Sequence, residues 1–385
     1  MPRTPLFLIG HIGGAPKPPA WWSFSGLREF EECPRRWVLA RTHVECFGGP
    51  IPQKPGKKTV EGILLHGLLE SYGKHIRTDS PAPFRPRQNL RELLASWSLT
   101  NLANRRVDAR ALAAQVGIEE VLRNFSVARN YIPTSGHGDT CRERSISSGR
   151  RTLGSEVWVE DPLSRLRGKL DFVTASEIVE FKSGDSCDWH EDQVRFYGAL
   201  HMAATGRAVK RLRLIYGRGD ARSEVILEGD AIGGMTLDGY RARADASDQK
   251  IMRGKIDAKP CLERCRGCHV RALCEAYWAG GWWEKDAEGC IDSCLMDYGA
   301  IHGGRFERCG AAGYLHGVVC GQDAAMLVPA DIADEVENHT ENIRVLCARC
   351  RTGGNRLSLV LTQLTEFFLV GKSGGGMRNA FPDST

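Results

Sequence analysis

A carboxylate and a lysine two residues apart, Glu180 and Lys182, are the first residues whose types and spacing could do chemistry. They lie in the apolar run 178–182, whose composition predicts a β-strand. Side chains alternate between the two faces of a strand, so both charged groups are expected on one face, about 7 Å apart. Asp171 lies nine residues upstream of Glu180, in a second strand-like run. We expect these carboxylates on neighbouring strands to hold Mg²⁺ or Mn²⁺, hard ions that prefer oxygen ligands.

An ion bound by these two carboxylates would polarise a phosphodiester and activate water for its hydrolysis. Lys182 would position that water or stabilise the charge that develops on the phosphate. An exposed Glu-x-Lys pair is common on strands without any catalytic role, so the motif needs support. Residues 188–204 predict a helix that places Gln193 and Tyr197 on one face. His66 lies in an apolar helix-like run, where a histidine is more often a satisfied core residue than a ligand.

Six short motifs occur along the chain, and their order carries more information than any one of them. The set resembles the PD-(D/E)XK nuclease superfamily, and more narrowly its RecB-like branch, which includes the CRISPR-associated iron–sulfur exonucleases and the nuclease domain of AddB. The resemblance covers residues 21–276. The matching residues are Ser23 and Ser25, Cys33 with Pro34, Gly62 with His66, Gly168 with Asp171, Glu180 with Lys182, and Gln193 with Tyr197.

The resemblance implies a fold, an activity and roles for these residues. The implied fold is α/β, a restriction-endonuclease-like core in which helices flank a mixed sheet. The implied activity is that of a metal-dependent DNA exonuclease acting at single-stranded DNA ends, in recombination, repair or phage- or CRISPR-related DNA processing. The implied metal ligands are His66, Asp171 and Glu180, the catalytic lysine is Lys182, and the residues that support the site and contact DNA are Gln193 and Tyr197.

The chain has 14 cysteines, which is the anomaly of its composition. A small secreted disulfide scaffold would explain them, but 385 residues can bury a core without staples. Metal binding in a reducing compartment is therefore the better interpretation. A tight set of three lies at Cys265, Cys268 and Cys274. This spacing suits either zinc, with Cys261 or His269 as the fourth ligand, or an iron–sulfur cluster.

The family resemblance favours the cluster. Its iron–sulfur members take three cysteines after the nuclease core and a fourth from the upstream Cys-Pro pair, which Cys33 matches. Such a cluster would join segments more than 230 residues apart, and closing so long a loop restricts the unfolded chain. Cys261 would remain a spare thiol or an alternative ligand. The implied ligands of a 4Fe–4S cluster are Cys33, Cys265, Cys268 and Cys274.

A second group of cysteines follows residue 285, and its pairs are spaced like zinc ligands. With His316 and His339, the segment resembles an HNH nuclease. The resemblance is incomplete, because Phe306 stands where a partner of Cys309 is expected, His316 has no adjacent second histidine, and Arg351 follows the last cysteine. No general base for water is therefore evident, and we expect a degenerate, noncatalytic zinc module. Its candidate zinc ligands are Cys290, Cys294, Cys309, Cys347 and Cys350.

Positioning these groups requires a particular order of elements. Ser23 and Ser25, followed by acidic residues, predict a helix start. Helix, strands, helix and strand in succession are typical of an α/β core. Periodicity and composition predict a helix over 59–75, a helical insertion over 88–130, three strands within 153–182, a helix over 188–204 and a strand over 212–216.

Charge and cysteine grouping predict the domain boundaries. Residues 281–385 hold 9 basic and 14 acidic residues, whereas the other 280 residues hold 43 basic and 33 acidic ones. A basic body suits a polyanion such as DNA, although solubility would explain it equally well. We expect an irregular segment over 1–20, a nuclease domain with an iron–sulfur clip over 21–280, a cysteine-rich domain over 285–372 and a disordered tail over 373–385.

Two other functions are compatible with these motifs: a noncatalytic DNA-binding protein that keeps the nuclease fold, and a nuclease subunit that acts with a separate helicase or recombination partner. Two carboxylates together with a lysine favour an enzyme over a binder. The chain has no Gly-x4-Gly-Lys-Ser/Thr loop, so a helicase would be a partner. No window has eighteen consecutive apolar residues, and the run 6–9 is too short for a signal peptide. We therefore expect a cytoplasmic protein of a bacterial or phage-infected cell, without membrane contact.

Overall fold

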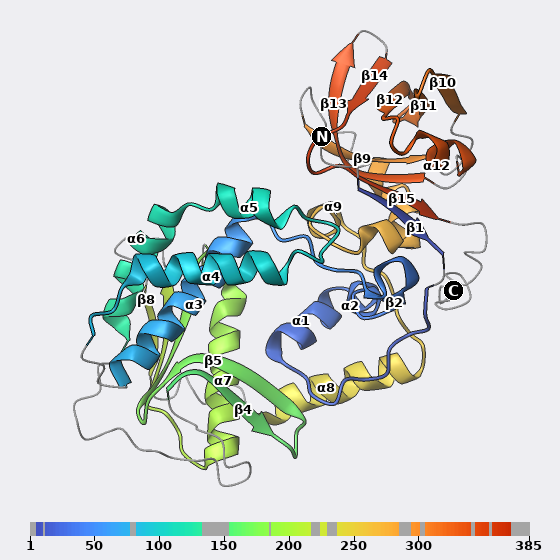
Figure 1. Cartoon of the computed structure of the whole chain (residues 1–385). Coiled ribbons are helices and arrows are strands. Elements are labelled where there is room, and N and C mark those ends of the chain that lie inside the picture. Colours follow the sequence, from blue (N-terminus) through green and yellow to red (C-terminus); the bar gives the residue numbers. More distant parts are fainter. Residues whose placement is uncertain are drawn as a thin grey trace. The chain divides into compact units, whose positions relative to one another are not determined.

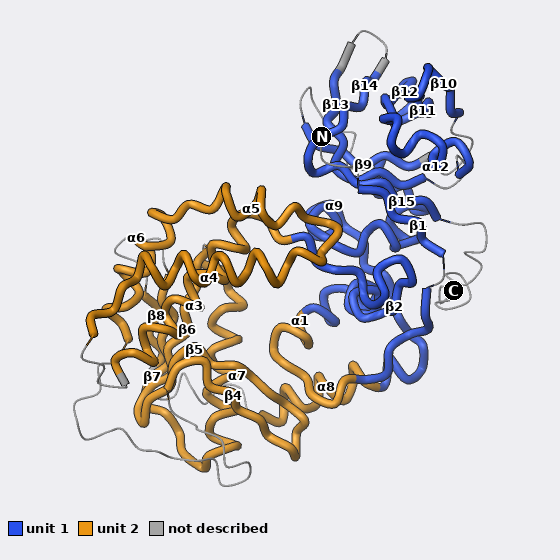
Figure 2. The backbone as a smooth tube through the Cα atoms, in the orientation of Figure 1, with its two compact units in different colours: residues 1–18, 29–54, 249–385 blue, residues 19–28, 55–248 orange. Residues whose placement is uncertain are grey.

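The computed structural model describes residues 5–10, 12–77, 82–132, 154–184, 186–216, 224–228, 237–284, 294–300, 305–339, 343–353 and 356–370. The chain forms two compact units, which Figure 2 colours separately. Unit 1 comprises residues 1–18, 29–54 and 249–385, and unit 2 comprises residues 19–28 and 55–248. Each unit therefore combines segments that are distant in the sequence.

Unit 2 is built around a mixed sheet of five strands, in the order β4 (Gly154–Asp161), β5 (Leu166–Val173), β6 (Glu177–Lys182), β7 (Arg211–Tyr216) and β8 (Glu224–Glu228). Neighbouring strands are antiparallel except β6 and β7, which are parallel. A parallel pair needs a crossover, and α7 (Asp188–Thr205) supplies it and packs along the sheet (Figure 1). The predicted strands and the predicted helix 188–204 are thus confirmed.

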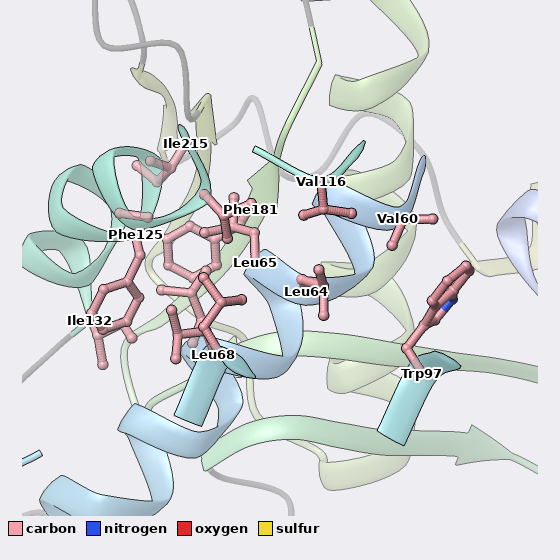
Figure 3. Packing of buried hydrophobic residues seen from close by; sticks show 14 of the residues in the cluster. Val60, Leu64, Leu65, Leu68, Trp97, Val116, Phe125, Ile132, Phe181 and Ile215 are labelled. Carbon is pink, nitrogen blue, oxygen red and sulfur yellow. The ribbon is translucent and has the colours of Figure 1, made fainter. Parts of the chain in front are cut away.

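Helices between the first motifs and the sheet supply most of the unit 2 core. They are α3 (Lys57–Arg77), α4 (Pro86–Thr100), α5 (Ala109–Gln115) and α6 (Ile118–Ala128), followed by the short η2 (Arg129–Tyr131). Leu64, Leu65 and Leu68 of α3 lie with Phe125 of α6 and Phe181 of β6 in one buried cluster (Figure 3). Burying this apolar surface fixes α3, and with it His66, against the sheet.

Two further helices frame α7. Helix α1 (Phe24–Glu32) begins at the predicted site, because the Ser23 hydroxyl accepts a hydrogen bond from the backbone N–H of Gly26 at 3.1 Å. The ring of Phe24 lies 5.8 Å from that of Phe196 on α7 and 6.3 Å from that of Tyr240 on α8 (Leu237–Met252). These aromatic contacts join the three helices within unit 2.

Unit 1 begins with short elements around the cysteine motifs. The side chain of Arg35 is buried and donates to the backbone carbonyl of Ile256 at 3.0 Å, which joins the first of these segments to the last. The elements are α2 (Pro34–Leu39), β2 (His43–Val44), η1 (Glu45–Phe47), β3 (Gly49–Pro50), α9 (Leu262–Arg266), η4 (Arg271–Leu273) and α10 (Glu275–Trp278).

The rest of unit 1 is an eight-stranded sheet. Its strands are β1 (Leu6–Ile9), β9 (Leu295–Ala300), β10 (Arg305–Cys309), β11 (Ala312–Val319), β12 (Gln322–Val328), β13 (Ile343–Gly353), β14 (Arg356–Val360) and β15 (Glu366–Val370). The strand order is β1-β15-β13-β14-β12-β11-β10, and β9 pairs with β13. One short helix, α12 (Ala333–Asn338), lies between β12 and β13 in the chain.

The structure corrects one expectation about the N-terminal segment. The first twenty residues are not irregular throughout, because residues 6–9 form β1 and pair in parallel with β15. Their partner lies some 360 residues away, so local composition gave no sign of it. By packing, residues 249–284 belong to the same compact unit as the C-terminal sheet. The tail 373–385 and Cys290 lie outside the described residues. Among the described helices, none combines the length and apolar character of a membrane span.

Candidate active site

The Glu-x-Lys motif lies where β5 and β6 separate. Backbone pairing of the two strands runs to Phe172 and Val179. One position further, the Asp171 carboxylate accepts a hydrogen bond from the backbone N–H of Phe181 at 2.7 Å. The side chain takes the place of a main-chain acceptor, which fixes its carboxylate beside Glu180. The two carboxylates that the sequence predicted on neighbouring strands therefore lie at one point of the sheet.

Lys182 has two oxygen partners. Its Nζ donates to Oε1 of Glu180 and to Oε1 of Gln193, each at 2.7 Å, and the Gln193 amide donates to the Tyr197 hydroxyl at 2.8 Å. Glu180 is 4% exposed, and its second oxygen, Oε2, is buried without a hydrogen-bond partner. A buried acceptor without a donor is costly. This oxygen is therefore suited to a cation.

Three ligand atoms lie together around Asp171, and Glu180 is not one of this group. One atom each from His66, Glu156 and Asp171 lie within 4.8 Å of one another. His66 Nδ1 is 3.3 Å from Asp171 Oδ1, although His66 comes from α3 and Asp171 from β5. Carboxylate oxygens with one imidazole are a donor set that fits Mg²⁺ or Mn²⁺. The histidine is thus a partner of the carboxylates rather than a residue of the apolar core.

The protonation of the site reflects its crowded charges. The Asp171 carboxylate raises the pKa of His66 to about 9. Burial alone would raise the pKa of Asp171, but the His66 imidazole and the Phe181 N–H lower it overall. Burial and the neighbouring Asp171 charge raise the pKa of Glu180. A divalent cation would favour the ionised form of both carboxylates, so metal binding and proton release are coupled here.

Two motif glycines permit close approaches that build the site. A Cβ on Gly168 would lie 2.8 Å from the Tyr197 ring, so only glycine lets that ring pack on β5. A Cβ on Gly62 would lie 2.8 Å from the Ser183 hydroxyl. Glycine at this position therefore lets α3 approach the end of β6, one helical turn before His66.

Sequence reasoning missed Glu156. The register of β4 with β5 sets Glu156 opposite Asp171, and its side chain also pairs with Lys169. Its φ of +54° lies in the left-handed region, which is uncommon for a residue other than glycine. The hairpin turn between β4 and β5 could have identified Glu156, because it fixes the register of the two strands, with Asp161 opposite Leu166. Counting back from that pair assigns Glu156 to the site.

Trp189, at the start of α7, was also missed. The Arg28 guanidinium lies 3.9 Å from the centroid of its ring, and the Lys182 ammonium lies 5.6 Å from it. The half-buried indole is therefore flanked by two cations beside the Glu-x-Lys motif. No motif spacing marks this residue, because Arg28 and Trp189 meet only in the tertiary structure.

The four cysteines assigned to an iron–sulfur cluster line one cavity in unit 1. Cys33 precedes α2, Cys265 lies in α9, and Cys268 and Cys274 lie on either side of η4. Burial raises the pKa of the Cys268 thiol to about 11 and that of Cys274 to about 12. Thiols so buried ionise readily only when a metal centre binds them. Cys261, the alternative ligand, directly precedes α9.

The thiols of this set are spread around the cavity. Within the described part of the chain, no three of their sulfurs lie within 4.8 Å of one another.

The described cysteines of the C-terminal region differ in exposure and in partners. Cys309 is exposed at the end of β10, whereas Cys350 is 1% exposed within the sheet. Cys347 accepts a hydrogen bond from Arg271 Nη2 at 3.3 Å. Cys294 contacts Cys350 through the backbone, because the Cys294 carbonyl accepts a hydrogen bond from the Cys350 N–H at 2.9 Å. Among the described residues these thiols form no group of three ligands, and Cys290 lies outside the described residues.

The comparisons with known proteins agree with the unit 2 site. The family model of the PD-(D/E)XK nuclease superfamily matches residues 21–275, about two thirds of the chain. None of the curated proteins matches the chain. The matched residues include every part of the site described above.

Proposed function

The chain belongs to the PD-(D/E)XK nuclease superfamily, and from this membership and the geometry of its site we propose that it is a metal-dependent DNA exonuclease acting at single-stranded ends. The superfamily indicates a nuclease that uses Mg²⁺ or Mn²⁺ and acts on DNA. Exonuclease action and the preference for single strands are the proposal. We assign the activity to DNA recombination, repair or phage- or CRISPR-related processing. A separate helicase would unwind any duplex, because the chain has no nucleotide-binding Gly-x4-Gly-Lys loop of its own.

One observation carries the proposal. The Lys182 ammonium is held at 2.7 Å by both Glu180 and Gln193, directly beside the unpaired buried oxygen of Glu180. A noncatalytic binding protein has no need to bury a carboxylate whose second oxygen has no donor. A nuclease does, because that oxygen can add to the ligands that His66, Glu156 and Asp171 offer a cation.

The residues of the chain divide the chemical work. A cation bound by His66, Glu156, Asp171 and Glu180 would polarise the scissile phosphate and lower the pKa of a water molecule. Lys182 stabilises the negative charge that develops on the phosphate oxygens, because its ammonium is already oriented and needs no rearrangement.

Two neighbours adapt the site to a strand end. Gln193 fixes the lysine and is itself fixed by Tyr197. Trp189, between Arg28 and Lys182, offers a ring on which a terminal base can stack while the guanidinium meets a phosphate. An unpaired base stacks in this way more readily than a base held in a duplex, which supports the preference for single strands.

The activity is tested by comparing linear and circular substrates. Purified chain is incubated with end-labelled linear DNA and with circular DNA, single-stranded and duplex, in Mg²⁺, Mn²⁺ or EDTA. We expect metal-dependent loss of linear single strands from their ends and survival of the circles. Cleavage of circles at the same rate would contradict exonuclease action. Binding without hydrolysis of any substrate in either metal would favour the noncatalytic alternative.

We further propose that Cys33, Cys265, Cys268 and Cys274 hold a 4Fe–4S cluster. Support comes from their common cavity and from the burial of their thiols. The cluster would join the segment before α2 to the segment around η4, and so stabilise unit 1 rather than take part in hydrolysis. Iron and sulfide analysis of protein purified without oxygen tests the proposal, and zinc in place of iron would contradict it.

A further inference from the structure

The strands that follow residue 294 form a closed circuit. β9 and β10 are successive in the chain and pair with different strands, β9 with β13 and β10 with β11. The pairs β11–β12, β12–β14 and β14–β13 complete the circuit. All its pairs are antiparallel except β12–β14, and α12 separates β12 from β13 in the chain. Counting β9 and β10 as one bent strand, this is the five-stranded Greek-key barrel of the OB-fold.

The interior of this barrel is filled by side chains. Leu315, Met326 and Leu359 are at most 2% exposed and alternate along their strands with exposed neighbours. Tyr298 is also buried, and a Cβ on Gly317 would lie only 2.1 Å from its hydroxyl, so glycine is required there. A packed interior leaves no room for a ligand, and any binding surface must lie on the outside of the strands.

The outer surface of β11 and β12, which we term the barrel face, is apolar and aromatic. Tyr314 is 39% exposed, Leu327 50% and Val318 56%. Tyr314 pairs in register with Leu327, and its ring centroid lies 6.2 Å from that of His316, two residues along β11. Exposed apolar side chains grouped with two rings on one sheet surface mark a binding site more often than a random surface.

Arginines border the barrel face on both sides. His316 pairs in register with Arg305 on β10 and with Ala325 on β12. Ala325 pairs with Ser358 on β14, which pairs with Arg351 on β13. The side chain of Arg305 is 75% exposed, and Arg351 is also exposed. These pairs form one row of side chains across five strands. It begins at Arg305, passes His316, Ala325 and Ser358, and ends at Arg351.

The acidity of this half of the chain does not extend to these strands. Strands β10–β14 contain six arginines and two acidic residues. Four acidic residues lie instead in residues 329–339, around α12, where no basic residue occurs. Of these arginines, Arg305, Arg349 and Arg351 are exposed, whereas Arg344 is buried beside Glu275 and Arg308 pairs with Asp334 and Glu337. One exposed carboxylate, Asp323, lies opposite Val318 on the barrel face. A polyanion that also offers flat apolar groups is complementary to such a surface.

We propose that the barrel face binds single-stranded nucleic acid, with bases stacked on Tyr314 and His316 and phosphates against Arg305 and Arg351. Stacking on aromatic side chains beside a basic border tolerates any sequence, because every base has a flat π-face. The inference deepens the proposed function and rests on it for the choice of DNA as the natural strand. It does not depend on the metal site, because binding requires no hydrolysis.

Glu307 restrains this surface. It lies opposite Tyr314 in the register of β10 with β11, and it forms ion pairs with Arg305 at 3.1 Å and with His316 at 3.2 Å. Its charge repels phosphate and occupies the arginine that would bind it. Glu307→Gln should therefore strengthen strand binding, an effect that misfolding cannot imitate.

The test measures binding by the full chain carrying Lys182→Ala, in EDTA, so that no strand is degraded. The probe is a fluorescently labelled oligothymidylate of about 20 nucleotides, longer than one barrel covers. Tyr314→Ala should weaken binding by about tenfold, the size of one lost base–aromatic stack, whereas Tyr314→Phe should retain it. Leu295→Ala, which removes an exposed leucine from β9 of the same barrel, is the control and should have no effect.

Charge variants give an independent readout. Arg351→Ala should lower the slope of log affinity against log salt by about 0.7, the contribution of one phosphate contact with a single strand. Glu307→Gln should tighten binding by about threefold, the size of one exposed charge interaction. Circular dichroism melting of each variant shows that the barrel remains folded.

Two results would overturn the proposal. The first is unchanged affinity of folded Tyr314→Ala and Arg351→Ala for the oligonucleotide. The second is a chain that is dimeric in solution and that these variants make monomeric without a change in affinity, since the barrel face would then be an interface between copies. A hydrolytic chain whose barrel variants bind normally refutes only this inference, whereas a chain that binds through the face but does not hydrolyse refutes only the proposed function.

Discussion

The unit 2 sheet and the barrel of unit 1 both contain residues spaced like ligands, but only the sheet brings them together. On β5 and β6 the half-buried carboxylate of Asp171 and the buried carboxylate of Glu180 become neighbours, joined to α3 and α7. In the barrel, Cys347 and Cys350 are three residues apart, yet one meets Arg271 and the other is enclosed in the sheet. Spacing along the chain therefore indicates a site only when the fold gives its members a common face.

The difference has a simple origin in strand geometry. Residues two apart on a strand share a face, so Glu180 and Lys182 are aligned by β6 itself. Cys347 and Cys350 both lie in β13, but the register of β13 with β9 shifts between Val345 and Ala348, so Cys347 lies within the irregularity and Cys350 after it. Cys347 also has a positive φ of 58°. The strand therefore does not align these two thiols as β6 aligns Glu180 and Lys182.

The largest expected effect is that of Lys182→Ala. It should reduce metal-dependent DNA hydrolysis by about 10²–10³-fold, because one preorganised cation no longer stabilises the transition state. DNA binding and melting temperature should stay close to those of the unaltered protein. Lys210→Ala, an exposed lysine in the same unit, is the control. If Lys210→Ala loses as much activity as Lys182→Ala, Lys182 has no special role in hydrolysis.

Cysteine variants test the same comparison with a metal readout. Cys274→Ala and Cys33→Ala should each abolish the brown colour and bound iron, since a cluster of four ligands is not held by three. Cys309→Ala, in the barrel, should leave iron and zinc content unchanged. Its thiol is exposed and belongs to no group of three candidate ligands among the described residues. Absorbance and elemental analysis measure both. Loss of zinc from the Cys309 variant would show that the barrel thiols do assemble a metal site.

Glu156→Gln should have an intermediate effect. It keeps the shape of the side chain but removes a charged ligand, so the metal concentration needed for half-maximal activity should rise by about tenfold. Activity at saturating metal should fall less. Glu160→Gln, on the same strand, is the matched control. An unchanged metal requirement would exclude Glu156 from the ligand set.

The smallest effect concerns pH. Burial lowers the pKa of His190 to about 4, and the charges of Lys182 and Arg28 add to this. The unfolded histidine titrates near 6.5, so it binds more protons than the native one between these values. This contribution to stability is therefore complete above about pH 6.5 and is lost as the pH falls toward 4. Between these pH values the melting temperature should fall less steeply for His190→Asn than for the unaltered protein. If the melting temperatures of the two proteins fall equally steeply with pH, the assignment of this effect to His190 is wrong.

Much of unit 2 could be predicted from the sequence because its signals are local. Apolar periodicity gave the helix around His66 and the helix carrying Gln193, and β-rich runs gave the three strands. The ordered motifs gave the residues that the structure places around Asp171. Glu156 and Trp189 escaped, because their roles depend on hairpin register and on a partner far along the chain.

Unit 1 was harder to predict because its order depends on distant pairing. β1 finds its partner in β15, and the barrel closes through β9 and β13, which are separated by three other strands in the chain. The exposed Tyr314 and Leu327 belong to no sequence motif, and only the register of β11 with β12 shows that they are paired.

The sequence by itself determined the nuclease family, the carboxylate–lysine motif and the order of helices and strands around it. These follow from residue identity and from periods of two and 3.6 residues, which act over short stretches of chain. The tertiary structure alone decided the unpaired oxygen of Glu180, the addition of Glu156, the separation of the C-terminal thiols and the closure of the barrel. Each of these depends on which distant segments exclude water together, and burial of that kind has no signature in the spacing of neighbouring residues.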